Sequence, residues 1–185
     1  MNAMRDYDIG SVDIVRTFVP VETSPVDYHH DALRYWNEKR GERFAPRWDD
    51  ISLMDFPSSV IPLISVTDII ADPLSSQYRF FGTKLVEIHG GDYSGKSPHL
   101  VPPRALGITN KGGCGRLVAD RAPHLEVKEF TNQRGILGRV IILRLPLSDD
   151  GEVVNHGVNI YYFEPARTYQ PQSDFFTQVF ATLPR

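Results

Sequence analysis

Histidine side chains are the first candidates for metal binding or proton transfer in this chain. Zinc ligands stand at short, regular spacings and are commonly accompanied by cysteines. The two adjacent histidines point in different directions on a helix, and the other four are scattered without a partner four residues away. The sequence therefore predicts no zinc site. The six residues are His29, His30, His89, His99, His124 and His156.

Paired acids and a glycine-rich stretch are the other candidates for chemistry. Asp49-Asp50 and Asp149-Asp150 stand at a helix start and a turn, where acids serve local geometry. Gly113-Cys114-Gly115 follows no strand and lacks the third glycine of a dinucleotide-binding loop. No serine, histidine and acid arrangement can be named from spacing, so we predict that the chain is not an enzyme.

The composition predicts one folded domain in the cytoplasm. The 185 residues are 41% hydrophobic and 23% charged, which suits a packed core. The net charge of -3 gives no basic stripe for nucleic acid. The single cysteine, Cys114, fits a reducing compartment. Charged residues within Met1 to Gly10 predict that this segment is not an export signal. Because the chain has no run of about 20 apolar residues, we also predict no membrane span.

Hydrophobic periodicity divides the chain into three parts. Residues 1–24 are predicted as an N-terminal arm with a short strand over 12–19, residues 25–165 as the main domain, and residues 166–185 as a helical extension capped by Ser173. The main domain opens with a helix from Pro25 to about Arg40, whose apolar stripe includes Val26, Leu33 and Trp36.

The rest of the main domain alternates strands and helices. Two antiparallel strands are predicted over 60–70 and 77–81, a short helix from Thr83 to His89, and a longer helix from Arg104 to Ala122. Three strands follow, the last two joined by a turn at Asp149-Asp150-Gly151. Because only one helical block interrupts consecutive hairpins, this order predicts an α+β fold with one antiparallel sheet.

Three segments carry a resemblance to a known family. They are WNEKRGERFAP (Trp36 to Pro46), YRFFGTKLVEIHGGDYSGK (from Tyr78) and the stretch from Leu145-Pro146-Leu147 to Gly157. Over residues 30–165 the chain resembles a bacterial family of largely single-domain PAS-like proteins. The resemblance implies a five-stranded antiparallel sheet whose inner face, with the short helices, encloses a small-molecule pocket.

The resemblance also implies which residues line that pocket. It lies between the inner face of the sheet and the helices from Thr83 to Ala122, and it suits a small, largely apolar or weakly acidic molecule. Arg79 and Arg139 could fix a carboxylate by two parallel hydrogen bonds. The candidate residues are Tyr78, Arg79, Phe80, Leu85, Ile88, His89, Leu117, Arg139, Asn159 and Tyr161.

Haem and flavin are not expected, and the identity of any cofactor stays open. Around Cys114, only Arg116 and Leu117 agree with the motif of flavin-binding light sensors. His89 and His99 stand nearest the expected pocket, but a lone histidine is more often a solvent-facing or hydrogen-bonded residue than a haem ligand. The purified protein is predicted to be colourless.

The resemblance implies a sensory module that signals by changing its contacts with a partner protein or a second copy of itself. We expect a homodimer that associates through Val26, Leu33 and Trp36. Two alternatives remain. One is a cone-shaped enzyme of the ketosteroid-isomerase kind, for which Asp68 and Tyr161 are the available acid and tyrosine. The other is an interaction domain with a filled core and no ligand.

Overall fold

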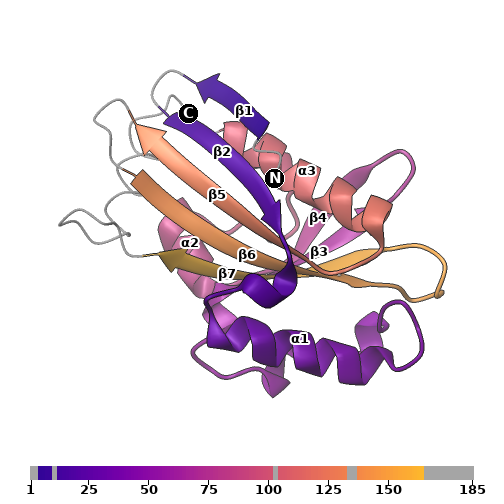
Figure 1. The fold of residues 1–185 in the computed structure, drawn as a ribbon. Helices are drawn as coiled ribbons and strands as arrows, with labels where there is room; N and C mark the ends of the chain where they lie inside the picture. Colours follow the sequence, from indigo (N-terminus) through magenta and orange to yellow (C-terminus); the bar gives the residue numbers. More distant parts are fainter. Residues whose placement is uncertain (1–3, 10–11, 102–103, 133–136, 165–185) are drawn as a thin grey trace.

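The computed structural model describes residues 4–9, 12–101, 104–132 and 137–164 (Figure 1). It is an α+β fold built on one antiparallel sheet in the order β1-β2-β5-β6-β7-β3-β4. The strands are β1 (Met4–Ile9), β2 (Val12–Val19), β3 (Ile64–Ile70), β4 (Ser75–Phe81), β5 (His124–Asn132), β6 (Leu137–Leu147) and β7 (His156–Glu164).

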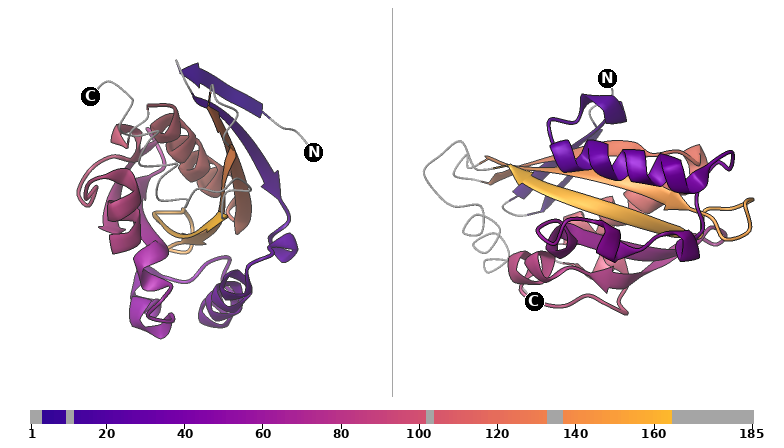
Figure 2. Two further views of the ribbon diagram at one scale, coloured as in Figure 1. Left: turned by 90° about the vertical axis from the view of Figure 1, so that its left-hand side faces the viewer. Right: turned by 90° about the horizontal axis from the view of Figure 1, so that it is seen from below.

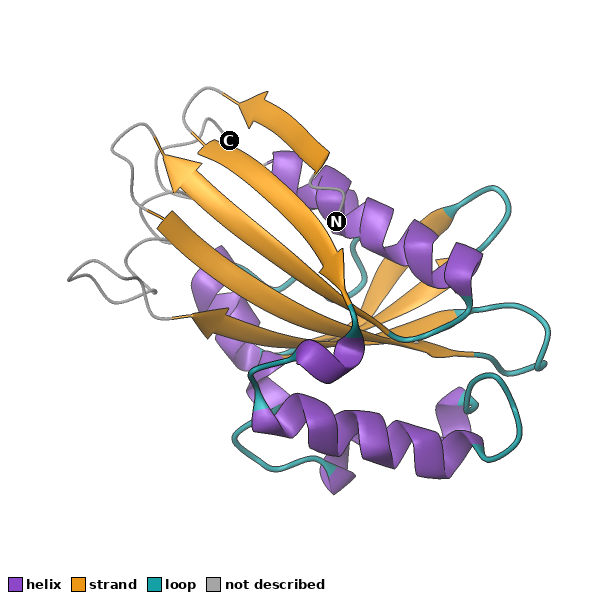
Figure 3. Ribbon diagram, viewed as in Figure 1, coloured by secondary structure: helices purple, strands orange, loops and turns teal. Residues whose placement is uncertain are grey.

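Helices cover both faces of the sheet, as Figures 2 and 3 show. Helix α1 (Asp27–Arg40) lies on one face with the short 3-10 turns η2 (Trp48–Asp50), η3 (Leu53–Asp55) and η4 (Ile61–Leu63). Helices α2 (Thr83–His89) and α3 (Arg104–Asp120) lie on the other face with η5 (Pro98–Leu100). A further turn, η1 (Val21–Thr23), connects β2 to α1. No helix in the described ranges is both long and apolar enough to cross a membrane.

The central strands are buried on both sides, and alternation decides which helix each side chain meets. In β6, Ile141 and Leu143 pack in the cluster beneath α1, whereas Val140 and Ile142 pack in the cluster beneath α2 and α3. Such strands are near-continuous runs of buried residues in the sequence, because neither face meets water.

The sheet is larger than predicted because the N-terminal segment joins it. The strand expected over residues 12–19 is confirmed as β2, which pairs with β5 from Val12↔Asn132 to Val19↔Leu125. Ile14 is fully buried, so β2 belongs to the core rather than to a separate arm. With β1 beyond it, the sheet has seven strands instead of five. The helix predicted after Ser173 lies outside the described residues.

The apolar stripe of α1 is covered by the protein's own sheet, which corrects its assignment as a dimer contact. The predicted helix is confirmed at Asp27–Arg40. Trp36 is only 3% exposed, and its indole Nε1 donates a hydrogen bond to the Pro146 carbonyl oxygen at 2.8 Å. Val26 is also buried, and Leu33 is half-buried. Val26 and Trp36 are therefore covered within one chain, whereas Leu33 stays partly exposed.

Candidate functional site

A buried cluster of charges lies on the inner face of the sheet, beneath α3. Glu126 and Lys128 of β5 are fully buried, and Arg144 of β6 is 2% exposed. The Arg144 guanidinium donates from Nε to Glu126 Oε2 at 2.7 Å. The Lys128 ammonium lies 3.8 Å from Glu126 Oε1. These side chains share one face because alternate residues of a strand point the same way and β5 pairs with β6.

A chain of amide and hydroxyl groups extends this cluster across the sheet. Arg144 Nη1 donates to Asn159 Oδ1 at 2.7 Å. The Asn159 amide donates to Ser65 Oγ and Thr67 Oγ1, each at 3.2 Å. Ser65 Oγ lies 3.3 Å from the Tyr161 hydroxyl. The network thus joins β6, β7 and β3 through hydrogen bonds in a water-excluded interior, where each bond is strengthened by the low local dielectric.

Helix α3 closes the cluster from above, and its glycines let it come close. Asn110 Oδ1 accepts a hydrogen bond of 2.7 Å from Lys128 Nζ. A Cβ atom on Gly113 would lie 2.6 Å from the Arg144 guanidinium, which is too close for any other residue without rearrangement. Close packing on a charged side chain therefore explains Gly113, one of the glycines that interrupt the helical pattern in the sequence.

A small cavity of about 20 Å³ adjoins the cluster. That volume holds about one water molecule. Its polar wall carries an amine, an amide, an imidazole and two phenols, and the rest of its wall is apolar. The lining residues are Tyr78, His89, Leu106, Asn110, Lys128, Phe130, Val140, Ile142, Tyr161 and Phe163.

Burial dominates the electrostatics of these groups. Desolvation and the nearby Arg144 lower the pKa of Lys128 to about 7, against the opposing effect of Glu126. Burial alone would raise the pKa of Glu126, but Arg144 and Lys128 hold it at about 2. Burial and the Lys128 charge lower the pKa of His89 to about 3. Near neutral pH the site therefore combines a fixed Glu126–Arg144 ion pair, a neutral imidazole and a lysine close to its titration midpoint.

Three of the residues predicted for the pocket line the cavity: Tyr78, His89 and Tyr161. Leu85 and Ile88 pack in the same apolar cluster without lining the cavity. Asn159 reaches the site through Arg144. Leu117 is buried in a separate cluster that contains Cys114.

The placement of Phe80 was wrong, because a bulge in β4 reverses the alternation there. Thr67 pairs with Tyr78 and Val66 pairs with Phe80, so Arg79 is the extra residue. Tyr78 consequently faces the inner cluster, whereas Phe80 packs in the cluster beneath α1.

The two arginines predicted to fix a carboxylate also lie outside the cavity. Arg79 is exposed and pairs with Asp68, Nε to Oδ1 at 2.7 Å. Arg139 pairs with Glu164, Nη1 to Oε1 at 3.0 Å. Arg139 stands near the start of β6 and Arg79 stands at the bulge of β4. At both places a long charged side chain can reach solvent and a surface acid.

The acid and tyrosine needed by the alternative enzyme do not meet. Asp68 Oδ1 lies 2.8 Å from His156 Nδ1, in the outer pair with Arg79, and Asp68 does not line the cavity that Tyr161 lines.

Cys114 is buried, and burial raises its pKa, so its thiol stays protonated near neutral pH. His99 is exposed and bonded to Ser97 Oγ at 2.7 Å. Among the described residues, no group of three or more His, Cys, Asp or Glu side chains could hold a metal ion.

Sequence reasoning missed the charged residues of the site. Glu126 and Lys128 alternate with Leu125 and Val127, a pattern that normally places charges on a solvated face. The available signal was Phe130, which shares their side of the strand and is itself buried. Asn110 gave no signal, because a polar residue in a glycine-rich helical segment looks the same whether it faces water or the core.

Comparisons with protein-family models, with curated proteins and with solved structures find no match for this chain.

Proposed function

We propose that this chain is a PAS-like sensory module of the cytoplasm that binds a small molecule in the cavity beneath α3. Five strands in the order β5-β6-β7-β3-β4, with α2 and α3 between β4 and β5, agree with the element order on which the resemblance rests. The module acts by changing its contacts with a partner protein, and no catalytic step is assigned to it.

The buried Glu126–Lys128–Arg144 cluster is the observation that carries the proposal. Removing three charges from water costs several kcal/mol per ion, and apolar residues of similar size often give equal or greater stability. Strongly shifted pKa values combined with a cavity are typical of functional sites. We therefore interpret the cluster, with its Lys128 amine at the cavity, as retained for recognition rather than for stability.

Ligand entry would have to move part of the structure around the cavity, because the cavity has room for about one water molecule. Helix α3 is the element suited to move. Its interior contains Gly107, Gly112, Gly113 and Gly115, and each glycine disfavours a helix by about 1 kcal/mol relative to alanine. A ligand that stabilises a displaced α3 would increase the population of that state. Ligand binding in the cavity would thereby change the surface that a partner protein contacts.

The small volume favours a second candidate, an interaction domain that carries no ligand. In that case the cavity holds only a structural water, and the buried charges fix the packing of α3. The two candidates differ in whether any small molecule stabilises the folded state.

A thermal-shift screen with small, largely apolar or weakly acidic metabolites tests the proposal. Val140→Phe places a ring in the cavity, so it should abolish the stabilisation that a hit gives to the wild type, since ligand binding to the folded state raises its stability. Ile141→Phe is the matched control, because Ile141 lies on the opposite face of the same strand beneath α1. It should keep the shift despite a comparable overpacking cost of about 1 to 3 kcal/mol.

A hit that stabilises both variants equally would place the site elsewhere. A screen without any hit, together with stabilisation of the ligand-free protein by the smaller change Val140→Ile, would support the ligand-free interaction domain instead.

A further inference from the structure

A second and larger hollow lies outside the inner-face cavity. It has a volume of about 400 Å³, within the usual size range of small-molecule sites. It is bounded by η1, by α1 and by the turn between α3 and β5. Its lining residues are Val21, Glu22, Leu33, Trp36, Asn37, Arg40, Phe44, Arg121, Ala122 and Pro123. We call this hollow the α1 cleft.

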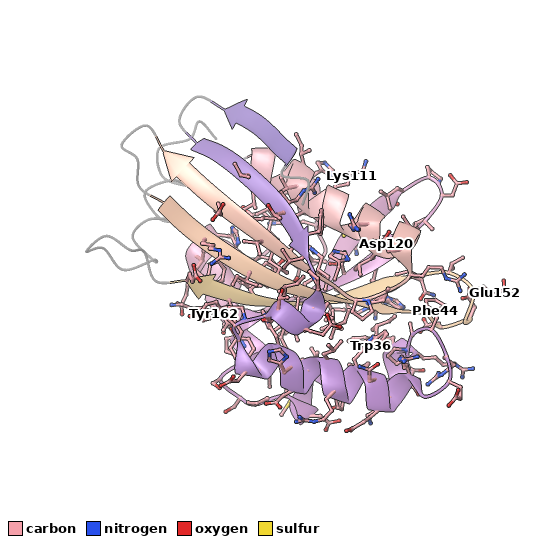
Figure 4. All side chains as sticks on the ribbon, in the orientation of Figure 1. Trp36, Phe44, Lys111, Asp120, Glu152 and Tyr162 are labelled. Carbon is pink, nitrogen blue, oxygen red and sulfur yellow. The ribbon has the colours of Figure 1, made fainter. Side chains whose placement is uncertain are left out.

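The α1 cleft combines an apolar floor with two cationic groups. Leu33, Trp36 and Phe44 supply the apolar surface, and Figure 4 labels Trp36 and Phe44 on the α1 side of the sheet. The Arg40 guanidinium lies over the Trp36 ring at 5.5 Å. The Arg121 guanidinium lies over the Phe44 ring at 4.1 Å.

Both guanidinium groups keep N–H donors that no other described residue uses. Arg40 uses Nε for Asn37 Oδ1 and Nη1 for the Arg43 carbonyl oxygen, both at 2.9 Å, which leaves Nη2. Arg121 makes no side-chain hydrogen bond or ion pair to another described residue. A guanidinium holds its N–H donors in a planar fork that matches a carboxylate.

The backbone of Arg121 adopts a left-handed conformation at the end of α3. Its φ is 51°, and it is the single non-glycine residue with a positive φ among the described residues. Its N–H closes the end of α3 by bonding to the Leu117 carbonyl oxygen at 3.0 Å. Glycine or asparagine usually occupies this position after a helix. The arginine therefore stands at a backbone position that disfavours it, with its side chain at the rim of the α1 cleft.

We propose that the α1 cleft is a binding site for a small monocarboxylate with an aromatic or branched apolar body. The apolar body would lie on Leu33 and Phe44, which are both partly exposed, and the carboxylate would accept hydrogen bonds from Arg121 and Arg40. Glu22 brings the formal charge of the lining to +1, which suits a single negative charge. The site is separate from the cavity beneath α3 and does not depend on the function proposed for it.

Titration calorimetry with phenylacetate, 4-methylpentanoate and indole-3-acetate tests this proposal. We expect at least one acid to bind, and its uncharged amide to bind about tenfold more weakly or worse, because the charge-assisted hydrogen bonds are lost. Arg121→Gly and Arg40→Gln should each weaken binding of the acid about tenfold or more.

The variants separate loss of the site from loss of the fold. Arg121→Gly removes the guanidinium but relieves the positive-φ position, so the melting temperature should not fall. Arg34→Gln is the matched control, because Arg34 is an exposed arginine of α1 that pairs with Asp31 at 2.6 Å and does not line the cleft. It should bind the acid as the wild type does, and so should Val140→Phe, whose change lies in the other cavity.

Absence of binding by all three acids up to about 5 mM, or binding that survives both Arg121→Gly and Arg40→Gln, would overturn the proposal.

Discussion

At the scale of single residues, the interior holds ionisable groups in the states that burial dictates. Lys128, His89 and His124 are all buried, and burial lowers the pKa of each of them. The charged form of a buried base loses its hydration, so its proton is held less tightly than in the unfolded chain. The stability of the fold must therefore depend on pH in a direction that can be worked out group by group.

Lys128 should make the protein more stable as the pH rises from about 7 to about 9. In this window the unfolded chain binds the lysine proton and the folded chain releases it, since the pKa falls from 10.5 to about 7 on folding. Stability therefore rises with pH. Lys128→Met should remove this rise, and Lys84→Met, which changes an exposed lysine paired with Glu87, should keep it. Urea unfolding across the window measures both. An unchanged slope in Lys128→Met would contradict the lowered pKa.

His124 should have the corresponding effect on the acid side. Burial, followed by the charge of Arg144, lowers its pKa to about 3, and neither ring nitrogen has a hydrogen-bond partner among the described residues. The unfolded chain takes up the proton first as the pH falls below about 6.5, so stability is lost between there and about pH 3.

His124→Leu should reduce that loss by up to about 1.4 kcal/mol per pH unit and should stabilise the fold at neutral pH by removing unsatisfied polar atoms. Urea midpoints at about pH 5 and about pH 7 check the change. Because His29 and His89 also have lowered pKa values, part of the acid sensitivity should remain. Retention of the full wild-type pH dependence would instead show that His124 is not buried in its neutral form.

At the scale of elements, α3 shows what the sequence could and could not predict. Its limits were predicted from Arg104 to Ala122 and confirmed at Arg104–Asp120, and the helix α2 and the paired strands β3 and β4 were also predicted close to their observed positions. Its partners could not be predicted, because Gly113, one of the glycines that weaken the helical pattern, is required by the Arg144 guanidinium, which comes from a strand about 30 residues further on. The bulge at Arg79 could not be predicted either, because regular alternation along β4 would put Tyr78 and Phe80 on the same face.

Two glycines of α3 should respond differently to the same substitution. Gly113→Ala would push a Cβ against a guanidinium that Glu126 and Asn159 hold in place, so it should cost about 1 to 3 kcal/mol. Gly115→Ala meets only the Leu74 Cδ2 atom at 3.1 Å, a side-chain tip that can move, and it gains helix propensity of up to about 1 kcal/mol. Urea unfolding compares the two. Equal effects would argue against the close approach of α3 to Arg144.

At the scale of the whole molecule, the sheet separates two buried cores, one on each of its faces. The side beneath α1 holds a large apolar cluster, whereas the side beneath α3 contains the Glu126–Lys128–Arg144 cluster. The α+β class and the antiparallel sheet followed from the order of the elements. The addition of β1 and β2 did not, because a strand that packs at the end of a sheet can be polar, irregular and short. The pocket residues were predicted only in part. A residue's position in the resembled fold indicates which face of the sheet it lies on, but it does not indicate which polar or charged groups that face carries.

The bulge at Arg79 also bears on how the sheet ends. Strand β4 is the last strand on its side, and an outer strand with free backbone groups can recruit a strand from another molecule. Here the N–H of Tyr78 donates to the Lys96 carbonyl oxygen at 2.9 Å, and the carbonyl oxygen of Tyr78 accepts from the Gly95 N–H at 2.8 Å. The chain's own loop thus occupies the outward hydrogen bonds beside a bulge that already bends the strand, and β4 offers a poor template for edge-to-edge aggregation.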